Sequence, residues 1–354
     1  MKNIIDLSQK LIRIESTADN KNGLYEVLEI AKKELKQFSV RTFEKNSTPS
    51  LLFSNIKNAK DFKILLNAHL DVIPGLKNQY KPLLKNGKLY GRGAQDMKAT
   101  AACEILVFKE LVNKVNYPLG LQLVTDEEIG GFNSAKYQIE KGIKADFVIA
   151  GEPTEFGINN EAKGIVWIKI IAKGKSSHGA YPWKGENAIT KMISFLNILQ
   201  KKYPVPSKES WTTTVNVSQI STSNKTTNKV PDNCEVVLDV RYVPLESEKI
   251  VKNVTSLIPK SFGYQILLKE PSQFTSENSK YIKLLKTETE KIIRRNVKTV
   301  YKHGGSDVRH FNQIGCEGIT FGPIGDGMHT DNEWVSIKSL NHYYQILTKF
   351  LLSI

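Results

Sequence analysis

The sequence predicts an α/β protein whose main domain is interrupted by a smaller, inserted α+β domain. Its 354 residues exceed the roughly 100–200 residues of one typical domain, so we expect two domains. Short apolar runs alternate with helical segments through the first half of the chain, which is the βαβ rhythm of an α/β layer fold. The middle of the chain instead contains several strand-like segments with two helical ones, and the first pattern returns near Ser276.

The first half begins with a helix and continues with buried strands. Apolar side chains at Ile4, Ile5, Leu7, Leu11, Ile12 and Ile14 have the spacing of an amphipathic helix packed on a core. Residues 62–68, 119–125 and 147–150 form short, mostly apolar runs that predict buried strands, and residues 99–112 predict a helix between the first two.

The middle and the end of the chain complete the prediction. We expect strands at 165–172, 213–220 and 235–243 and helices at 187–201 and 246–257, which together form the insert, and a closing helix at 340–352. The expected domain boundaries are therefore 1–163 and 276–354 for the main domain and 164–275 for the insert.

Composition argues against several classes of protein. The chain is 40% hydrophobic and 24% charged, as is usual for soluble globular proteins. It has no run of about 18 apolar residues that would span a membrane, and its start lacks the apolar core of a signal peptide. Cys103, Cys234 and Cys316 lie far apart and suggest neither disulfides nor thiolate metal ligands, so we expect a cytoplasmic protein.

The basic character of the chain does not predict nucleic-acid binding. The net charge is +14, but the lysines are scattered and no basic stripe is interleaved with aromatic residues. A solvated lysine-rich surface is the simplest interpretation, and attraction of an anionic substrate is the functional alternative.

Histidines and carboxylates follow the predicted strands. His69 comes directly after the strand at 62–68, with Asp71 two residues later; consecutive acids at 126–128 follow the strand at 119–125, and Glu152 follows the strand at 147–150. In open α/β sheets ligands bind beyond the carboxyl ends of the strands. Taken alone, each of these signals is weak, because the acids at 126–128 could form an ordinary solvated loop.

Two glycine-rich loops add to this set of residues. Asp96 lies just before a predicted helix, where an N-cap is the simpler explanation, and His329 lies in the loop at 327–331. Imidazole and carboxylate are accepted ligands of Zn²⁺. There are more carboxylates than one tetrahedral ion can use, whereas two ions about 3.5–4 Å apart could share a bridging carboxylate.

At this point the sequence resembles a known family, the di-zinc peptidases and deacylases that include succinyl-diaminopimelate desuccinylase, acetylornithine deacetylase, aminoacylase and carboxypeptidase G-type enzymes. The matching blocks run in the family's order from about residue 67 to 337: HLDVIPG, GRGAQDMKAT, TDEEIGG, GEPT, SSHGAYPWKGENAI and GPIGDGMHTDNEWVSI. The resemblance implies a mixed-sheet catalytic domain with helices on both faces and an insert that serves as a dimerisation domain.

The resemblance also implies roles for individual residues. His69 and Glu152 would bind one zinc ion, Glu128 and His329 would bind the other, and Asp96 would bridge both. Glu127 would be the general base, and Asp71 would orient His69. The residues alone do not distinguish Glu127 from Glu128. The family further implies a cis peptide bond between Asp96 and Met97.

The insert is expected to contribute to substrate binding. A lone loop histidine such as His178 is usually just solvated, but in the family this histidine contacts the substrate carbonyl from a second subunit, which implies a homodimer. Asn228, Arg241, Gly305 and Ser306 resemble positions that hold an anionic substrate group. A surface salt bridge for Arg241 and a plain turn at 304–306 are the alternatives, and Arg309 and His310 receive no role.

The expected activity is two-zinc hydrolysis of the amide bond of a small N-acyl amino acid, such as N-succinyl-diaminopimelate or acetylornithine. Each subunit would bind two Zn²⁺, for which Co²⁺ or Mn²⁺ can substitute. A carboxypeptidase or dipeptidase that acts on short peptides is the alternative, since it would share every catalytic residue. A metal-binding homologue without activity is a third possibility, against which the presence of Glu127 and His178 argues.

Overall fold

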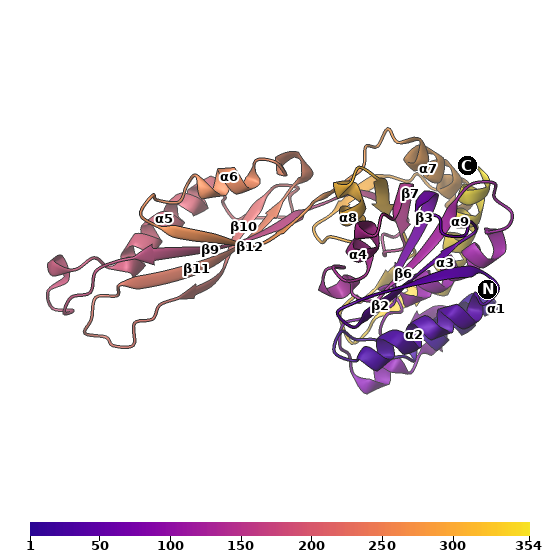
Figure 1. Cartoon of the computed structure of the whole chain (residues 1–354), viewed down its shortest axis with the longest axis horizontal. Helices are drawn as coiled ribbons and strands as arrows, with labels where there is room; N and C mark the ends of the chain where they lie inside the picture. The colour runs from indigo at the N-terminus through magenta and orange to yellow at the C-terminus, as the bar shows by residue number, and fades with distance from the viewer. The chain divides into compact units, whose positions relative to one another are not determined.

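The computed structural model describes residues 1–354, and the chain divides into two compact units (Figure 1). The first unit contains Met1–Glu161, Gln273–Tyr301 and Ser306–Ile354, and the second contains Ala162–Ser272 and Lys302–Gly305. Residues 273–275, which were predicted in the insert, lie in the first unit, whereas residues 162–163 and 302–305, which were predicted in the main domain, lie in the second.

A mixed sheet of nine strands forms the centre of the first unit. Its order is β1-β2-β6-β3-β7-β15-β8-β13, with β14 paired to β8. β3 runs parallel to β6 and β7, and β15 runs parallel to β7, whereas β2 is antiparallel to β1 and β6. The strands are β1 (Ser39–Lys45), β2 (Thr48–Ser54), β3 (Asp61–His69), β6 (Leu119–Val124), β7 (Lys144–Ala150), β8 (Ile158–Ala162), β13 (Gln273–Phe274), β14 (Thr299–Lys302) and β15 (Glu317–Thr320).

Helices cover both faces of this sheet (Figure 1). Because side chains alternate along a strand, Ile64 and Leu66 of β3 enter a different apolar core from Leu65. The larger core contains residues from α1 (Lys2–Ile12), α2 (Lys21–Glu34), α3 (Lys98–Leu111), α7 (Lys280–Ile293) and α9 (Ile337–Leu352). The smaller core contains residues from α8 (Val308–Gln313), and Ile139 of α4 (Ala135–Glu140) packs against it. The predicted fold class is confirmed.

A second, small sheet of the first unit positions two loops. It has the order β16-β17-β5-β4, and Trp334 of β17 pairs with Tyr90 of β5. Its strands are β4 (Leu83–Lys85), β5 (Lys88–Tyr90), β16 (Gly325–Asp326) and β17 (Trp334–Ser336). The loop at 91–97 follows β5, and the loop at 327–333 joins β16 to β17, which is the neighbour of β5.

The second unit is an antiparallel sheet with two helices. The strand order is β10-β11-β9-β12, and its core includes Val166, Ile168 and Ile170 on one face of β9. The elements are β9 (Gly164–Lys173), α5 (Ala188–Lys202), β10 (Thr214–Ser221), β11 (Asn233–Tyr242), α6 (Ile250–Thr255) and β12 (Gly263–Glu270). The strand β12 was not predicted from the sequence, and the second helix starts later than predicted, because Pro244–Glu246 form a separate 3-10 turn. None of the helices in either unit combines the length and the apolar character that crossing a membrane requires.

Candidate metal centre

Three neighbouring parallel strands end at the same edge of the large sheet and bring ligand-type side chains with them. His69 is the last residue of β3, and Glu127 and Glu128 lie in a 3-10 turn (Glu127–Ile129) shortly after β6. Glu152 follows the end of β7 by two residues. Because β6, β3 and β7 are adjacent in the sheet, their carboxyl ends meet, and these side chains converge.

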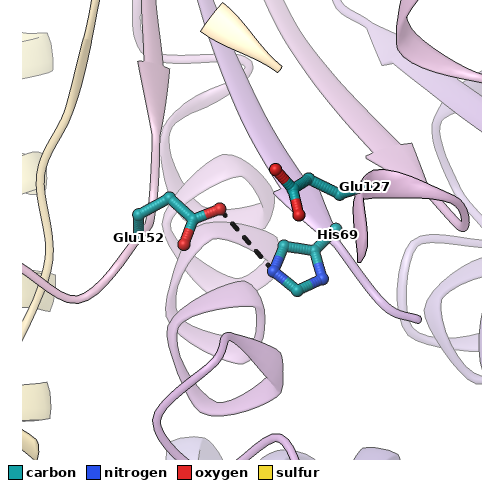
Figure 2. A group of neighbouring side chains, drawn as sticks. All are labelled: His69, Glu127 and Glu152. Atoms are coloured by element: carbon teal, nitrogen blue, oxygen red, sulfur yellow. Dashed lines mark ion pairs between the residues drawn. The ribbon is translucent and has the colours of Figure 1, made fainter. Parts of the chain in front are cut away.

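The imidazole of His69 is buried and held in one orientation. It is 1% exposed, and its Nδ1 lies 3.0 Å from the backbone oxygen of Asp71, to which it donates a hydrogen bond. The other ring nitrogen, Nε2, faces the acids. Nε2 lies 2.9 Å from Oδ1 of Asp96 and 3.6 Å from Oε1 of Glu152 (Figure 2). Such an imidazole is poised to coordinate a cation.

The carboxylate of Asp96 lies between two imidazoles. Its Oδ1 faces His69, and its Oδ2 lies 3.4 Å from Nε2 of His329. The N-cap interpretation of Asp96 is wrong, because the cap position is occupied by Met97 and has no side-chain cap bond. The peptide bond between Asp96 and Met97 is cis, as predicted.

Glu127 and Glu128 have different neighbours. One ligand atom from each of His69, Glu127 and Glu152 lies within 4.8 Å of the other two (Figure 2), and the same holds for His69, Asp96 and Glu128. Of the two glutamates, only Glu128 also contacts His329, through its Oε2 at 3.2 Å from Nε2 of His329. The geometry therefore places Glu127 on the His69–Glu152 side of the cluster and Glu128 on the His329 side.

The electrostatics of the cluster favour bound cations. Burial raises the pKa of Glu127, and the charge of Glu152 raises it further. Hydrogen bonds to Asp96 and Glu128 raise the pKa of His329 to about 10. The crowded carboxylates thus favour added positive charge, and two imidazoles with four carboxylates form a nitrogen and oxygen donor set that suits divalent ions. We conclude that the residues present fit metal binding.

Arg309 and His310, to which the sequence analysis gave no role, contact the turn that carries the two glutamates. Arg309 Nη2 lies 2.7 Å from the backbone oxygen of Gly130, and His310 Nε2 lies 2.9 Å from the same oxygen. Asp307 is fully buried beside them, and a Cβ on Gly131 would lie 1.9 Å from its Oδ1. Only the fold brings α8 against this turn, so no local pattern could have revealed the contact.

Three of the residues expected at the substrate lie within Ala162–Ser272 of the second unit. His178 is exposed, and the backbone N–H of Gly179 donates to the oxygen of Asn228 at 2.6 Å, so these two segments are neighbours. Arg241 Nε donates to Oδ1 of Asp239 at 2.9 Å, which is the ion pair left open as an alternative.

The remaining two lie where the chain passes between the units. Gly305 is exposed at the end of the second unit. Ser306 begins a segment of the first unit and is 3% exposed. Its hydroxyl donates to Oε1 of Gln273 at 3.0 Å.

Comparison with known proteins places the chain in a family. The sequence model of peptidase family M20/M25/M40 matches residues 65–353. The chain belongs to this family. The resemblance seen in the sequence blocks is thereby confirmed, and this M20 protein is a hydrolase of the metallopeptidase and amidohydrolase type.

Relatives of this M20 protein include a desuccinylase and peptidases. A succinyl-diaminopimelate desuccinylase of Rickettsia bellii is 28% identical over 372 residues, covering 97% of this chain and 95% of the relative. The structure of aminopeptidase PepT from Bacillus cereus aligns with a TM-score of 0.82 at 19% identity, covering 99% of this chain and 97% of that one. A dinuclear metal binding peptidase of the M20 family from Bacillus subtilis aligns with a TM-score of 0.74 at 12% identity, covering 99% and 97%.

Proposed function

We propose that this M20 protein is a two-metal deacylase that hydrolyses the amide bond of a small N-acyl amino acid, such as N-succinyl-diaminopimelate or acetylornithine. One observation carries the proposal. The two oxygens of Asp96 face two different imidazoles, with Glu152 beside one and Glu128 beside the other. The extent of the match to a desuccinylase, 97% of this chain, supports the choice of substrate class.

The proposed ligand sets follow this arrangement. His69 and Glu152 would hold one ion, Glu128 and His329 would hold the other, and Asp96 would be a ligand of both. Zn²⁺ is proposed because it accepts both imidazole and carboxylate ligands, and Co²⁺ or Mn²⁺ can substitute. The hydrogen bonds of Asp71 support a positioning role, because its backbone oxygen accepts from His69 and its Oδ2 accepts the N–H of Glu128 at 3.0 Å.

Glu127 is the proposed general base. When bound, the ions activate the attacking water and polarise the scissile carbonyl. Glu127 takes a proton from that water and delivers it to the nitrogen of the leaving amine, so its carboxylate ends the reaction as it began. Its place beside His69 and away from His329 supports this division of labour between Glu127 and Glu128.

The second unit is proposed as the dimerisation domain, and the first unit as the catalytic domain. In this proposal His178 of a second copy donates a hydrogen bond to the oxyanion that develops on the substrate carbonyl. Asn228, Arg241, Gly305 and Ser306 hold the anionic end of the substrate; for Arg241, the fork geometry of the guanidinium supports this role. The proposed homodimer acts on a small molecule and needs no nucleic acid or membrane. Its three cysteines are all buried and free, which supports the cytoplasm as its location.

The proposal is tested with metal-loaded protein and a panel of N-succinyl and N-acetyl amino acids, dipeptides and tripeptides. We expect about two metal equivalents per chain by elemental analysis and the highest kcat/KM on an N-acyl amino acid. Glu127→Gln should keep both ions and lose about 10²–10⁴-fold in kcat, whereas Glu128→Gln should lose metal. Preference for a free peptide would favour the alternative, a carboxypeptidase or dipeptidase. Near-normal turnover of Glu127→Gln would remove it as the base.

A further inference from the structure

Glu333, which the sequence analysis did not single out, places a buried carboxylate behind the loop that carries Asp96. It is 2% exposed and directly precedes β17. Its Oε1 accepts the backbone N–H groups of Gln95 at 2.9 Å and Asp96 at 3.1 Å, and its Oε2 accepts that of Gly93 at 3.0 Å. One side chain therefore satisfies three backbone donors of the loop at 91–97.

Arg92 completes this arrangement and extends it to the loop that carries His329. It is 3% exposed, and its Nη1 donates to Oε2 of Glu333 at 2.7 Å. Its Nη2 donates to the backbone oxygen of Thr330 at 3.2 Å, and Thr330 directly follows His329. The guanidinium fork thus connects both loops at once.

This ion pair is buried, and the hydrogen bonds around it are concentrated on the carboxylate of Glu333, whereas Nε of Arg92 has no hydrogen-bond partner. A buried ion pair is costly unless further hydrogen bonds satisfy it, and the carboxylate of Glu333 receives four. Bonds of ionised groups are about twice as strong as neutral ones. One backbone hydrogen bond, from the N–H of Gly91 to the oxygen of Glu333 at 3.1 Å, also joins the two loops, and the ion pair adds a buried side-chain constraint to it.

We propose that Arg92 and Glu333 are positioning residues that hold Asp96 and His329 at the separation needed for one metal ion. The inference rests on the proposed two-metal function. Its consequence is that loss of the pair weakens the ion held by Glu128 and His329, because His329 is 46% exposed in its side chain and has a positive φ of 64°. Gln79 Nε2 also holds this loop, through the oxygen of Thr330 at 3.0 Å, whereas His69 is the last residue of β3 and donates to Asp71.

The test compares Glu333→Gln and Arg92→Lys with a matched control, Glu290→Gln. Glu290 also accepts a backbone N–H, from Val297 at 3.0 Å, but belongs to α7. Metal-free protein is titrated with Zn²⁺ against a chromophoric chelator, and folding is checked by near-UV circular dichroism. We expect the weaker-bound ion to lose about 10–100-fold in affinity in both site variants, with the tighter-bound ion less affected and the control unchanged.

Several outcomes separate positioning from mere structural support. Arg92→Lys keeps a positive charge for Glu333 but cannot reach Thr330 at the same time, so it should fold even if Glu333→Gln does not. Folded variants that bind both ions with wild-type affinity would overturn the inference, even if they melt at lower temperature. A wild-type protein that binds fewer than two ions would instead overturn the proposed function.

Discussion

Substituting Gly131 by alanine tests how tightly α8 is packed against the turn that carries the two glutamates. Gly131 has a φ of +67°, and a Cβ there would lie 1.9 Å from Oδ1 of Asp307. Gly87 is the matched control, since it has a φ of +71° but no atom within 4 Å of the added Cβ. Both alanines face the same backbone penalty, and only one of them meets a carboxylate.

The expected losses of stability can be worked from these two environments. The left-handed conformation costs an alanine about 1–2 kcal/mol, offset by about 0.4–1 kcal/mol because alanine restricts the unfolded chain. Gly87→Ala should therefore lose roughly 1 kcal/mol. At Gly131 overpacking adds about 1–3 kcal/mol, because Asp307 is a short, fully buried side chain that cannot swing away.

Urea unfolding followed by circular dichroism, with both variants measured side by side, gives the comparison. We expect Gly131→Ala to unfold at clearly lower urea than Gly87→Ala and to lose activity, because its turn carries Glu127 and Glu128. Equal midpoints for the two variants would show that α8 yields easily and would refute the packing argument.

Two further predictions concern pH and assembly. Burial and, to a smaller extent, the charge of Arg309 lower the pKa of His310 from an ordinary value of 6.5 to about 3. Between these pH values the unfolded chain binds a proton at this imidazole and the folded protein does not. The contribution of His310 to stability is therefore present above pH 6.5 and lost as the pH falls toward 3. His310→Gln, in which the amide can still donate a hydrogen bond, should lose less stability than wild type between pH 7 and about pH 4 in urea midpoints. For assembly, mixing the inactive variants His178→Ala and Glu127→Ala should restore up to about a quarter of wild-type activity. Random assortment makes half of the dimers mixed, and one of the two sites in each mixed dimer works. No recovery despite proven subunit exchange would mean that His178 acts within its own chain or outside catalysis.

The strands that the sequence predicted share a local cause. β9 and β11 bury alternate residues, and β3 is apolar because both of its faces are covered. Burial therefore determines which positions of a strand are apolar, and that pattern can be recognised in the sequence. The strands β4, β5, β16 and β17 have only two or three residues each, too few for a period, and they exist because their neighbours pair with them.

The candidate site likewise contains residues that the sequence predicted and contacts that only the tertiary structure shows. His69, Glu127, Glu128 and Glu152 were predictable as a group, because parallel strands deliver whatever follows them to one edge of a sheet. Their individual roles came from the family resemblance and stay predictions. That Asp96 lies between two imidazoles was decided only by the tertiary structure.

The contacts that place the loops join residues remote in the chain. Arg92 and Glu333 are 241 positions apart, and Arg309 and Gly130 are 179 apart. Neither contact produces a periodic or adjacent pattern, because each joins residues that only the tertiary structure brings together. The sequence by itself determined the family, the fold class and the residue types of the site, and the tertiary structure decided which buried hydrogen bonds hold those residues in place.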